Sequence, residues 1–395
     1  MSTPYLSPAQ FKAELEKCLQ CKTKPCQTAC PVKCSPHDFI AAAKNADIAE
    51  AAAHISTHNP LGEVCGLVCP DKFCMRACLR QHIDAPIKIP QVQAEIMRRA
   101  RQQSLLSVSN KPHTNGSRIA IVGAGPAGIG AAAVLLPLGF ETEVFEQHST
   151  VGGALNLIPP IRLPREVIAA EWAKFAQYPN LHLHNNTKVT DFNALLKQGF
   201  SAVIAATGEQ KSRILGIEGE NLATDYTAYL QTPEKYATNG KVAVVGGGAA
   251  AVDCAVTAAK AGAAQVEMFV RRRLSDMRIS DAERKLLLEQ QIDISTMTRV
   301  TKIEKQQNNL TLYTCKTQFT TDGKLADIPQ TQIPRPNFAL TITALGSTRL
   351  HDIAETENIF YSGDFLNGSS TVVEALASGK KVAKIIVEKI KNTVR

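Results

Sequence analysis

The spacing of apolar and polar residues changes character along the chain. Through roughly the first hundred residues, apolar side chains recur at helical spacing between cysteine-containing loops, and helices are predicted at 41–55 and 91–102. Residues 104–117 are rich in Ser, Asn, Pro and Gly and are predicted to be a linker. Beyond this linker, short apolar runs lead into glycine-rich turns and then into alanine-rich helical stretches, and this succession occurs twice.

Each of the two successions has the pattern of a βαβ unit. The first, RIAIVGAGPAG, starts at Arg118, and the second, KVAVVGGGAAAVDCA, starts at Lys241. In both, a predicted strand is followed by a glycine turn, a helix and a second strand, which indicates two doubly wound, nucleotide-binding domains. Residues 119–140 form an uncharged run of membrane-spanning length, but Pro137 and the internal glycines would break a lipid-exposed helix. We therefore expect a βαβ unit there and no membrane span.

The first glycine turn has the G-x-G-x-x-G spacing of a dinucleotide site. The first glycine permits a tight turn, the second lets the backbone approach a pyrophosphate, and the third lets the helix pack close to the strand. Glu146 ends the next predicted strand, where a carboxylate would accept the ribose hydroxyls. The residues predicted to bind a cofactor here are Gly123, Gly125, Pro126, Ala127, Gly128 and Glu146.

The second glycine turn has the G-x-G-x-x-A form, with Gly246, Gly248 and Ala251. Its second predicted strand, 265–270, is followed not by an acid but by three arginines beginning with Arg271 and Arg272. Arginine at the ribose position suits a 2′-phosphate, so this turn is expected to prefer NADP(H) over NAD(H). The alternative is a solvated basic loop without a ligand.

Two dinucleotide sites in one chain indicate a flavin and a nicotinamide brought together. Near the C-terminus, Gly363 and Asp364 follow an apolar run, and an apolar helix is predicted to start near Thr371. The carboxylate would contact the sugar chain of a flavin, and the start of the helix would face its ring. Short glycine turns at 206–208 and 344–346 are expected to mark where the chain crosses between domains.

The cysteines are concentrated near the N-terminus: the chain has 11, of which nine lie between Cys18 and Cys78. One set is spaced C-x2-C-x4-C-x3-C and followed by proline, and a second is spaced C-x3-C-x4-C-x3-C. In ferredoxin-like runs three thiolates hold one iron–sulfur cluster, and the fourth cysteine, followed by proline, binds the other cluster. The spacing therefore predicts two [4Fe–4S] clusters. Structural zinc is the chief alternative, and disulfides are a weaker one.

The two remaining cysteines, Cys254 and Cys315, lie alone in apolar segments. They are predicted to be small, buried hydrophobic residues rather than ligands.

Composition narrows the class of protein. The chain has 395 residues, a length typical of about two to three domains, and 44% of the residues are hydrophobic, so buried cores are expected. The net charge of +8 comes from interspersed residues, and only 5% are aromatic, which disfavours nucleic-acid binding. The first residues lack a charged segment followed by an apolar run, so no secretion signal is predicted, and we expect a cytoplasmic protein.

In combination, these motifs resemble the small subunit of glutamate synthase and its relatives, among them the N-terminal half of dihydropyrimidine dehydrogenase and the small subunit of its bacterial counterpart. The resemblance covers almost the whole chain and rests on CLQCKTKPCQTACP, NPLGEVCGLVCP, IVGAGPAG, IPPIRLP, VVGGGAAAVDCA, RRRLSDM and SGDF…STVVEALASGK. It implies an α/β protein with an α-helical iron–sulfur domain at 1–110. A FAD-binding domain would follow at 111–225 and 341–395, with an NAD(P)H-binding domain inserted at 226–340.

The resemblance also implies ligands. One cluster would use Cys18, Cys21, Cys26 and Cys78, and the other Cys30, Cys69, Cys74 and, after the PIKI stretch, Gln93. Gly153 and Arg162 would join the cofactor-binding residues, and Cys65 would be spare.

The chain also departs from the family pattern. Cys69 and Cys74 are one residue closer than expected, Cys34 is additional, Ala249 replaces an asparagine, and Arg278-Ile279 replaces Pro-Ala.

Three functions agree with these features. The first is an electron-transfer subunit that moves electrons from NADPH through FAD and the clusters to a separate, large catalytic subunit, with no protein acid or base needed. The second is a self-contained NAD(P)H oxidoreductase acting on a small acceptor, and the third a cofactor-bearing redox sensor or scaffold. No Cys pair lies beside either glycine turn, which disfavours a disulfide reductase. The oligomeric state stays open.

Overall fold

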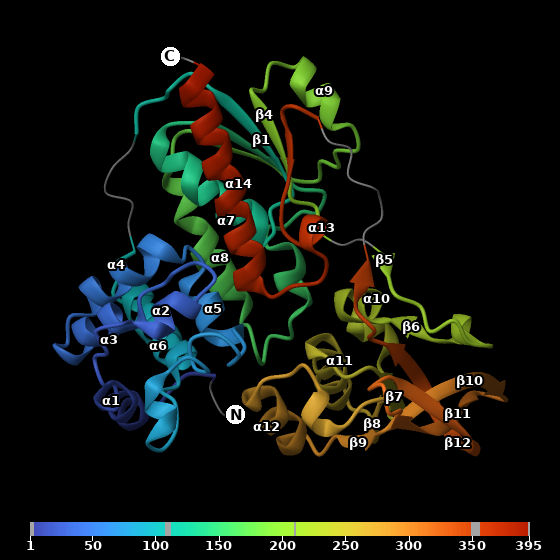
Figure 1. Cartoon of the computed structure of the whole chain (residues 1–395). Helices are drawn as coiled ribbons and strands as arrows, with labels where there is room; N and C mark the ends of the chain where they lie inside the picture. The colour runs from blue at the N-terminus through green and yellow to red at the C-terminus, as the bar shows by residue number, and fades with distance from the viewer. Residues whose placement is uncertain (1–3, 107–111, 209–210, 349–355, 394–395) are drawn as a thin grey trace. The chain divides into compact units, whose positions relative to one another are not determined.

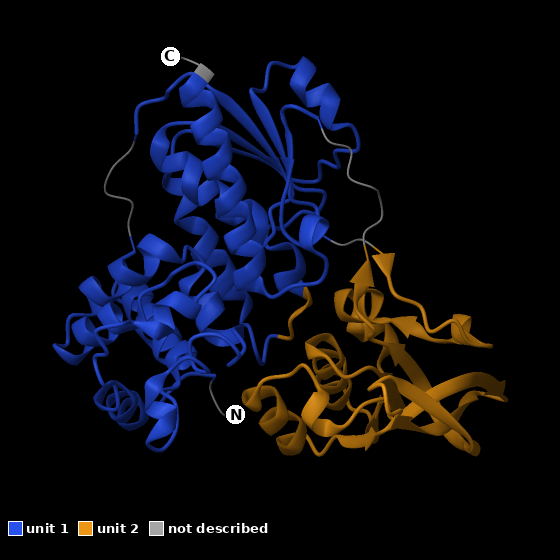
Figure 2. Cartoon of the chain, in the orientation of Figure 1, with its two compact units in different colours: residues 1–156, 160–210, 349–395 blue, residues 157–159, 211–348 orange. Residues whose placement is uncertain are grey.

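The computed structural model describes residues 4–106, 112–208, 211–348 and 356–393. The chain divides into two compact units, one made of residues 1–156, 160–210 and 349–395, and the other of residues 157–159 and 211–348 (Figure 2). The main segment of the second unit runs from 211 to 348, whereas the family resemblance implies an inserted domain at 226–340. The difference arises because β5 (Lys211–Ser212) pairs antiparallel with β13 (Ser347–Thr348), so that both crossing segments belong to the second unit.

The N-terminal part of the first unit is α-helical, as the sequence predicts. Its helices are α1 (Pro8–Glu16), α2 (Pro25–Ala29), α3 (Pro36–Lys44), α4 (Ile48–His58), α5 (Gly62–Val68), the 3₁₀ turn η1 (Leu79–His82) and α6 (Ile89–Gln102). The helix predicted at 91–102 is confirmed as α6. Its buried face includes Val92, Ile96 and Met97.

The single helix predicted at 41–55 is wrong, because the chain turns between α3 and α4. Ala46 has a positive φ of 61°, which no helix interior tolerates. The Asp47 side chain then accepts a hydrogen bond from the backbone N–H of Glu50 at 2.8 Å and begins α4. The alanine-rich pattern is continuous across this break, so helical spacing alone does not reveal it.

The rest of the first unit is a five-stranded parallel sheet in the order β14-β4-β1-β2-β3. Its strands are β1 (Arg118–Val122), β2 (Glu141–Phe145), β3 (Leu181–His184), β4 (Ala202–Ala205) and β14 (Ile359–Tyr361). Its helices and 3₁₀ turns are α7 (Pro126–Leu135), η2 (Leu136–Leu138), η3 (Gly153–Leu157), α8 (Arg165–Ala173), η4 (Phe175–Gln177), α9 (Phe192–Lys197), α13 (Asp364–Asn367) and α14 (Val372–Thr393). Figure 1 shows α14 beside α7 along the sheet.

The apolar run 119–140 is therefore β1, α7 and η2, as expected for a βαβ unit. Within the part of the chain that the structure describes, no helix combines the length and apolarity needed to cross a membrane. The predicted linker at 104–117 includes residues 107–111, which lie outside the described residues.

The second unit is built on a mixed sheet in the order β10-β11-β12-β7-β8-β9, with β6 also paired to β12. Besides β5 and β13, its strands are β6 (Thr224–Asp225), β7 (Lys241–Val245), β8 (Gln265–Val270), β9 (Asp293–Thr296), β10 (Thr298–Gln306), β11 (Asn309–Phe319) and β12 (Leu325–Thr343). Its helices and 3₁₀ turns are η5 (Glu220–Leu222), α10 (Tyr226–Gln231), η6 (Pro233–Tyr236), α11 (Ala249–Lys260), η7 (Leu274–Asp276) and α12 (Asp281–Glu289). Strands β12, β7, β8 and β9 are parallel, and β10, β11 and β12 form an antiparallel extension.

Candidate nucleotide and iron–sulfur sites

The first glycine turn joins β1 to α7 at the carboxyl edge of the parallel sheet. Gly123 has a φ of 107°, and a Cβ atom there would lie 2.5 Å from the carbonyl oxygen of Ala206. A Cβ atom on Gly128 would lie 2.0 Å from the carbonyl oxygen of Gly123, so the helix can approach the turn only with glycine at this position. The N-terminus of α7 is thereby aimed at the space above β1, where a phosphate would be stabilised.

A second pair of glycines borders the same space. Gly152 and Gly153 have φ values of 113° and 53°, and a Cβ atom on Gly125 would lie 3.8 Å from the Cα atom of Gly153. A side chain at Gly125 would enter the gap between these two segments. Bare backbone on both sides is the arrangement that a pyrophosphate requires.

Glu146 follows β2 at the same edge and is only 4% exposed. Its carboxylate accepts hydrogen bonds from the backbone N–H groups of Ala124 and His148, both at 2.9 Å. The first of these bonds holds Glu146 against the glycine turn, where the sequence placed the ribose of a dinucleotide.

Two buried hydroxyl groups at the ends of neighbouring strands lack partners among the described atoms. They are Oγ1 of Thr207, after β4, and Oγ of Ser362, after β14. The strand order reverses between β1 and β4, the usual binding position in such sheets, and Thr207 follows β4 at that position. Ser362 follows β14, one strand further out. The donors and acceptors present therefore fit a bound dinucleotide.

The C-terminal helix completes this edge. Gly363 has a φ of 67°, and a Cβ atom there would lie 2.7 Å from that of Ala127 at the start of α7. Asp364 accepts a hydrogen bond from the Ser370 hydroxyl. Thr371 immediately precedes α14 and donates from Oγ1 and from its backbone N–H to Glu374 at 2.7 and 2.9 Å. The helix predicted to start near Thr371 is confirmed as α14.

Arg162 lies in the loop before α8 and interacts with neighbouring groups of the structure.

The second glycine turn repeats the geometry of the first. Gly246 has a φ of 151°, and a Cβ atom there would lie 2.2 Å from the carbonyl oxygen of Ala344. Gly248 precedes α11, and a Cβ atom there would meet nothing within 4 Å. Ala251 is fully buried beneath the turn. The turns at 206–208 and 344–346 thus support the two glycine turns, in addition to preceding the places where the chain crosses between units.

Three consecutive arginines follow β8 and line one pocket with Asp276 and the β11–β12 hairpin. The guanidinium of Arg273 donates to Asp276 at 3.0 Å and lies 4.6 Å from the ring of Phe319. Arg271 and Arg272 carry no side-chain hydrogen bond or ion pair to the described residues. Burial and the nearby charges of Arg272 and Arg299 lower the pKa of Arg271, which indicates a field that attracts anions.

The hairpin residues of this pocket are Phe319, Gly323, Lys324 and Leu325. Sequence reasoning missed them because nearly fifty residues separate them from the arginines. The hydroxyl of Thr317 donates to the Arg271 carbonyl oxygen at 2.7 Å and holds the hairpin strand against the arginine loop. No motif at 317–325 marks this contact.

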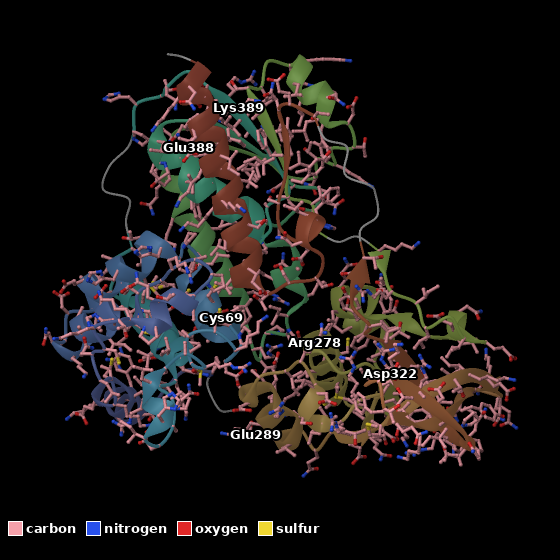
Figure 3. All side chains as sticks on the ribbon, viewed as in Figure 1. Cys69, Arg278, Glu289, Asp322, Glu388 and Lys389 are labelled. Atoms are coloured by element: carbon pink, nitrogen blue, oxygen red, sulfur yellow. The ribbon has the colours of Figure 1, made fainter. Side chains whose placement is uncertain are left out.

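Arg278 lies in the loop between η7 and α12 (Figure 3). Its backbone forms a β-bridge with Gly248, so the arginine that departs from the family pattern stands beside the second glycine turn.

Four of the cysteines assigned to one cluster, Cys18, Cys21, Cys26 and Cys78, line a single pocket with mostly apolar walls. We call them the first thiol group. Burial raises the pKa of Cys26 to about 11, with a further contribution from Cys18 and Cys78. The backbone N–H groups of Gln27 and Cys26 lower the pKa of Cys26 and so oppose this shift, as backbone donors do around cluster thiolates.

Five further cysteines form a second thiol group, namely Cys30, Cys34, Cys65, Cys69 and Cys74, joined by mutual electrostatic interactions. The neighbouring Cys65 side chain, together with burial, raises the pKa of Cys69, which is labelled in Figure 3. Burial raises the pKa of Cys74 to about 12. Cys74 also interacts with Cys26, so the two groups are adjacent.

Gln93, from α6, is buried beside the second thiol group. Its Nε2 donates to the Gly62 carbonyl oxygen at 2.7 Å, and its Oε1 lies 3.8 Å from Sγ of Cys34. The structure therefore brings together the cysteines that sequence reasoning assigned to each cluster. It adds Cys34 and Cys65 to the second group.

The structure contains no preformed site for a single metal ion among the residues it describes, since no three His, Cys, Asp or Glu side chains converge tightly enough. Cys254 and Cys315 are buried in α11 and β11, away from the two thiol groups in sequence, as predicted.

The second thiol group lies next to α14. The ammonium of Lys380, on α14, donates to the His58 carbonyl oxygen and interacts electrostatically with Cys34 and Cys30. Lys72, near Cys69 and Cys74, pairs with Glu374 of α14 at 3.5 Å. One helix thus contacts the iron–sulfur part of the unit and, through its N-terminus, borders the first nucleotide site. Sequence reasoning did not single out Lys380.

Comparison with protein families assigns both parts of the chain. The model described as dihydropyrimidine dehydrogenase domain II, 4Fe-4S cluster, matches residues 2–105. The model described as pyridine nucleotide-disulphide oxidoreductase matches residues 117–379.

Individual proteins agree with these matches. The NAD-dependent dihydropyrimidine dehydrogenase subunit PreT of Salmonella typhimurium is 29% identical over 97% of this chain and 95% of its own length. The glutamate synthase [NADPH] small chain of Escherichia coli is 29% identical over 76% of this chain and 68% of its own length. The structure of Mycobacterium tuberculosis FprA in complex with NADPH superposes with a TM-score of 0.60 at 16% identity, over 70% of this chain and 85% of that one, and shows the fold alone.

Proposed function

The chain belongs to the pyridine nucleotide-disulphide oxidoreductase family, and from this premise we propose that it is an electron-transfer subunit. Electrons would pass from NADPH to FAD, then to two [4Fe–4S] clusters and on to a separate catalytic subunit. The observation that carries this proposal is that both thiol groups and the first nucleotide site belong to one compact unit. Within it, α14 contacts both through Lys380 and the start of the helix.

The two nucleotide sites would take different cofactors. In the first unit, Glu146 suits the ribose of FAD, because a flavin dinucleotide carries no 2′-phosphate. In the second unit, Arg271 and Arg272 present cations where a ribose-binding carboxylate would stand in an NAD site. Among the relatives, PreT is named NAD-dependent and the glutamate synthase chain is named for NADPH. The arginine pair favours NADPH for this chain.

The cofactors supply the redox chemistry: bound flavin exchanges a hydride with a nicotinamide and single electrons with iron–sulfur clusters. The residues of the chain would orient these cofactors and stabilise their charges. Gly123, Gly125 and the start of α7 would hold the FAD pyrophosphate, and Asp364 would face its sugar chain. The backbone N–H groups at the sulfurs of Cys26 and Cys30 stabilise thiolates, which adjusts the potential of whatever cluster they bind.

The proposal is tested on full-length chain purified without oxygen. We expect flavin and iron absorption, bleaching of the flavin by NADPH, and NADPH-dependent reduction of an artificial dye. Glutamine and pyrimidines should not turn over until a catalytic subunit is added. Turnover of a small physiological acceptor by the chain alone would favour the self-contained oxidoreductase, and flavin that NADPH fails to bleach would favour a sensor or scaffold. Material without iron would contradict the proposal.

A further inference from the structure

We propose that Cys34 supplies the fourth ligand of the second [4Fe–4S] cluster, in the place that the family resemblance gives to Gln93. The inference rests on the proposed function, since it takes the second thiol group to be a cluster site. It assigns a ligand that the resemblance does not provide, because Cys34 is additional to the family pattern.

The second thiol group and the neighbouring Gln93 together offer six possible ligands, whereas one cluster needs four. Four of the six form two close pairs. Cys65 and Cys69 lie one helical turn apart at the end of α5, where the Cys69 N–H donates to the Cys65 carbonyl oxygen at 2.9 Å. Cys34 and Gln93 lie 3.8 Å apart, from Sγ to Oε1. The four ligands of a cubane cluster bind four different irons and stand apart around it, so each close pair supplies one ligand. With Cys30 and Cys74, the two pairs complete a set of four.

Within the pair of Cys34 and Gln93, the thiol is the better donor. A thiolate is a soft anion that iron–sulfur clusters bind preferentially, whereas the Gln93 amide is a neutral oxygen donor. The amide already donates from Nε2 to the Gly62 carbonyl oxygen at 2.7 Å, which anchors the side chain without iron. When its sulfur binds iron, Cys34 would release its thiol proton to the solvent.

The backbone between Cys30 and Cys34 turns Cys34 back toward the site. Lys33 has a φ of 59°, and its N–H donates to the Cys30 carbonyl oxygen at 3.0 Å. The backbone N–H groups of Val32, Lys33 and Cys34 lower the pKa of Cys30, and that of Ser35 lowers the pKa of Cys34, against the larger upward effect of burial. Both sulfurs thus have the backbone donors that accompany cluster thiolates.

A fourth thiolate adds one negative charge to a buried site, and a cation is in place to balance it. The ammonium of Lys380 interacts electrostatically with Cys34 and Cys30 and is anchored on the His58 carbonyl oxygen. Cys34 itself is only 2% exposed, so water contributes little to this balance.

The test uses full-length chain prepared anaerobically, with the variants Cys34→Ser, Gln93→Leu and Cys65→Ser, and Cys315→Ser as the matched control. Iron and sulfide per chain, flavin content, and the electron paramagnetic resonance spectrum of the reduced protein are measured. We expect Cys34→Ser to lose about half of the iron, or to keep it with a changed spectrum and a shifted midpoint potential. Gln93→Leu, Cys65→Ser and Cys315→Ser should match the wild type.

Loss of iron or a changed spectrum in Gln93→Leu overturns the proposal whatever Cys34→Ser does, and so does a Cys34→Ser variant identical to wild type. If Cys34→Ser fails to fold, as shown by lost flavin, then unchanged iron in both Gln93→Leu and Cys65→Ser supports Cys34 by elimination. A changed spectrum in Cys65→Ser alone would assign the fourth ligand to Cys65 and would also overturn the proposal. Wild-type protein with iron for one cluster only would instead contradict the proposed function.

Discussion

At the scale of single residues, the two glycine turns depend on the same close contact between a glycine and a carbonyl oxygen. Gly123 and Gly246 each follow a central strand, and both have a positive φ. Each lies against the carbonyl oxygen of an alanine that follows a neighbouring parallel strand, Ala206 for Gly123 and Ala344 for Gly246. Any side chain at either glycine would collide with that oxygen. Because this collision allows only glycine at these two positions, the glycine spacing could be recognised in the sequence alone.

The arginine pair gives a prediction at this scale. The double variant Arg271→Glu, Arg272→Glu should lower kcat/KM for NADPH by about 10-fold or more and change kcat/KM for NADH little. The reason is that the charge of two side chains that suit a 2′-phosphate is reversed. The measurement is kcat/KM for each cofactor in dye reduction. Lys285→Glu, a charge reversal on α12 outside the pocket, serves as the control. An unchanged preference in the double variant would remove Arg271 and Arg272 from the 2′-phosphate site.

At the scale of elements, the packing of α7 against α14 connects the first nucleotide turn to the C-terminal helix. A Cβ atom on Gly379 would lie 1.8 Å from the Ala127 carbonyl oxygen, and one on Gly130 would lie 2.3 Å from that of Leu376. The two helices therefore touch backbone to backbone, and the helix that carries Lys380 and Thr371 is held by that contact. The sequence predicts both helices but not their contact.

Gly379→Ala should push α14 away from α7. We expect it to cost about 1–3 kcal/mol of stability and to lower bound flavin, because the overlap is with backbone that cannot rotate away. The flavin-to-protein absorbance ratio and the thermal midpoint measure this. Lys381→Ala, two residues further along the same helix and exposed, should behave as wild type. Full flavin content in Gly379→Ala would show that the contact is dispensable.

At the scale of the whole molecule, the iron–sulfur part and the first nucleotide domain form one unit through buried polar contacts. Oε1 of Glu171, on α8, accepts from the backbone N–H of Glu63 on α5 at 2.9 Å, and Lys174 donates to the Pro60 carbonyl oxygen at 3.1 Å. Oε2 of Glu171 is buried without a hydrogen-bond partner. Burial raises the pKa of Glu171 above its ordinary value of 4.5, only partly offset by Lys174.

This raised pKa gives a pH prediction. A carboxyl group whose pKa is higher in the folded than in the unfolded chain favours folding below the unfolded pKa, and this contribution is lost as pH rises toward the folded value. Stability should therefore fall as pH rises from about 4.5, and Glu171→Gln should remove that fall. Thermal midpoints across pH measure it, with Glu166→Gln, exposed on the same helix, as the control. Parallel pH profiles for wild type and Glu171→Gln would refute the role of burial.

The amino-acid sequence by itself determined the two βαβ units and their glycine turns, and its cysteine spacing predicted two groups of thiols. Each depends on local constraints: strand and helix periodicity, a backbone that only glycine allows, and ligand spacing along a short loop. Only the tertiary structure decided that Phe319 and Lys324 join the arginine loop, that Cys34 lies against Gln93, and that Lys380 faces the second thiol group. These contacts link residues far apart in the chain, and their distances depend on how whole elements pack.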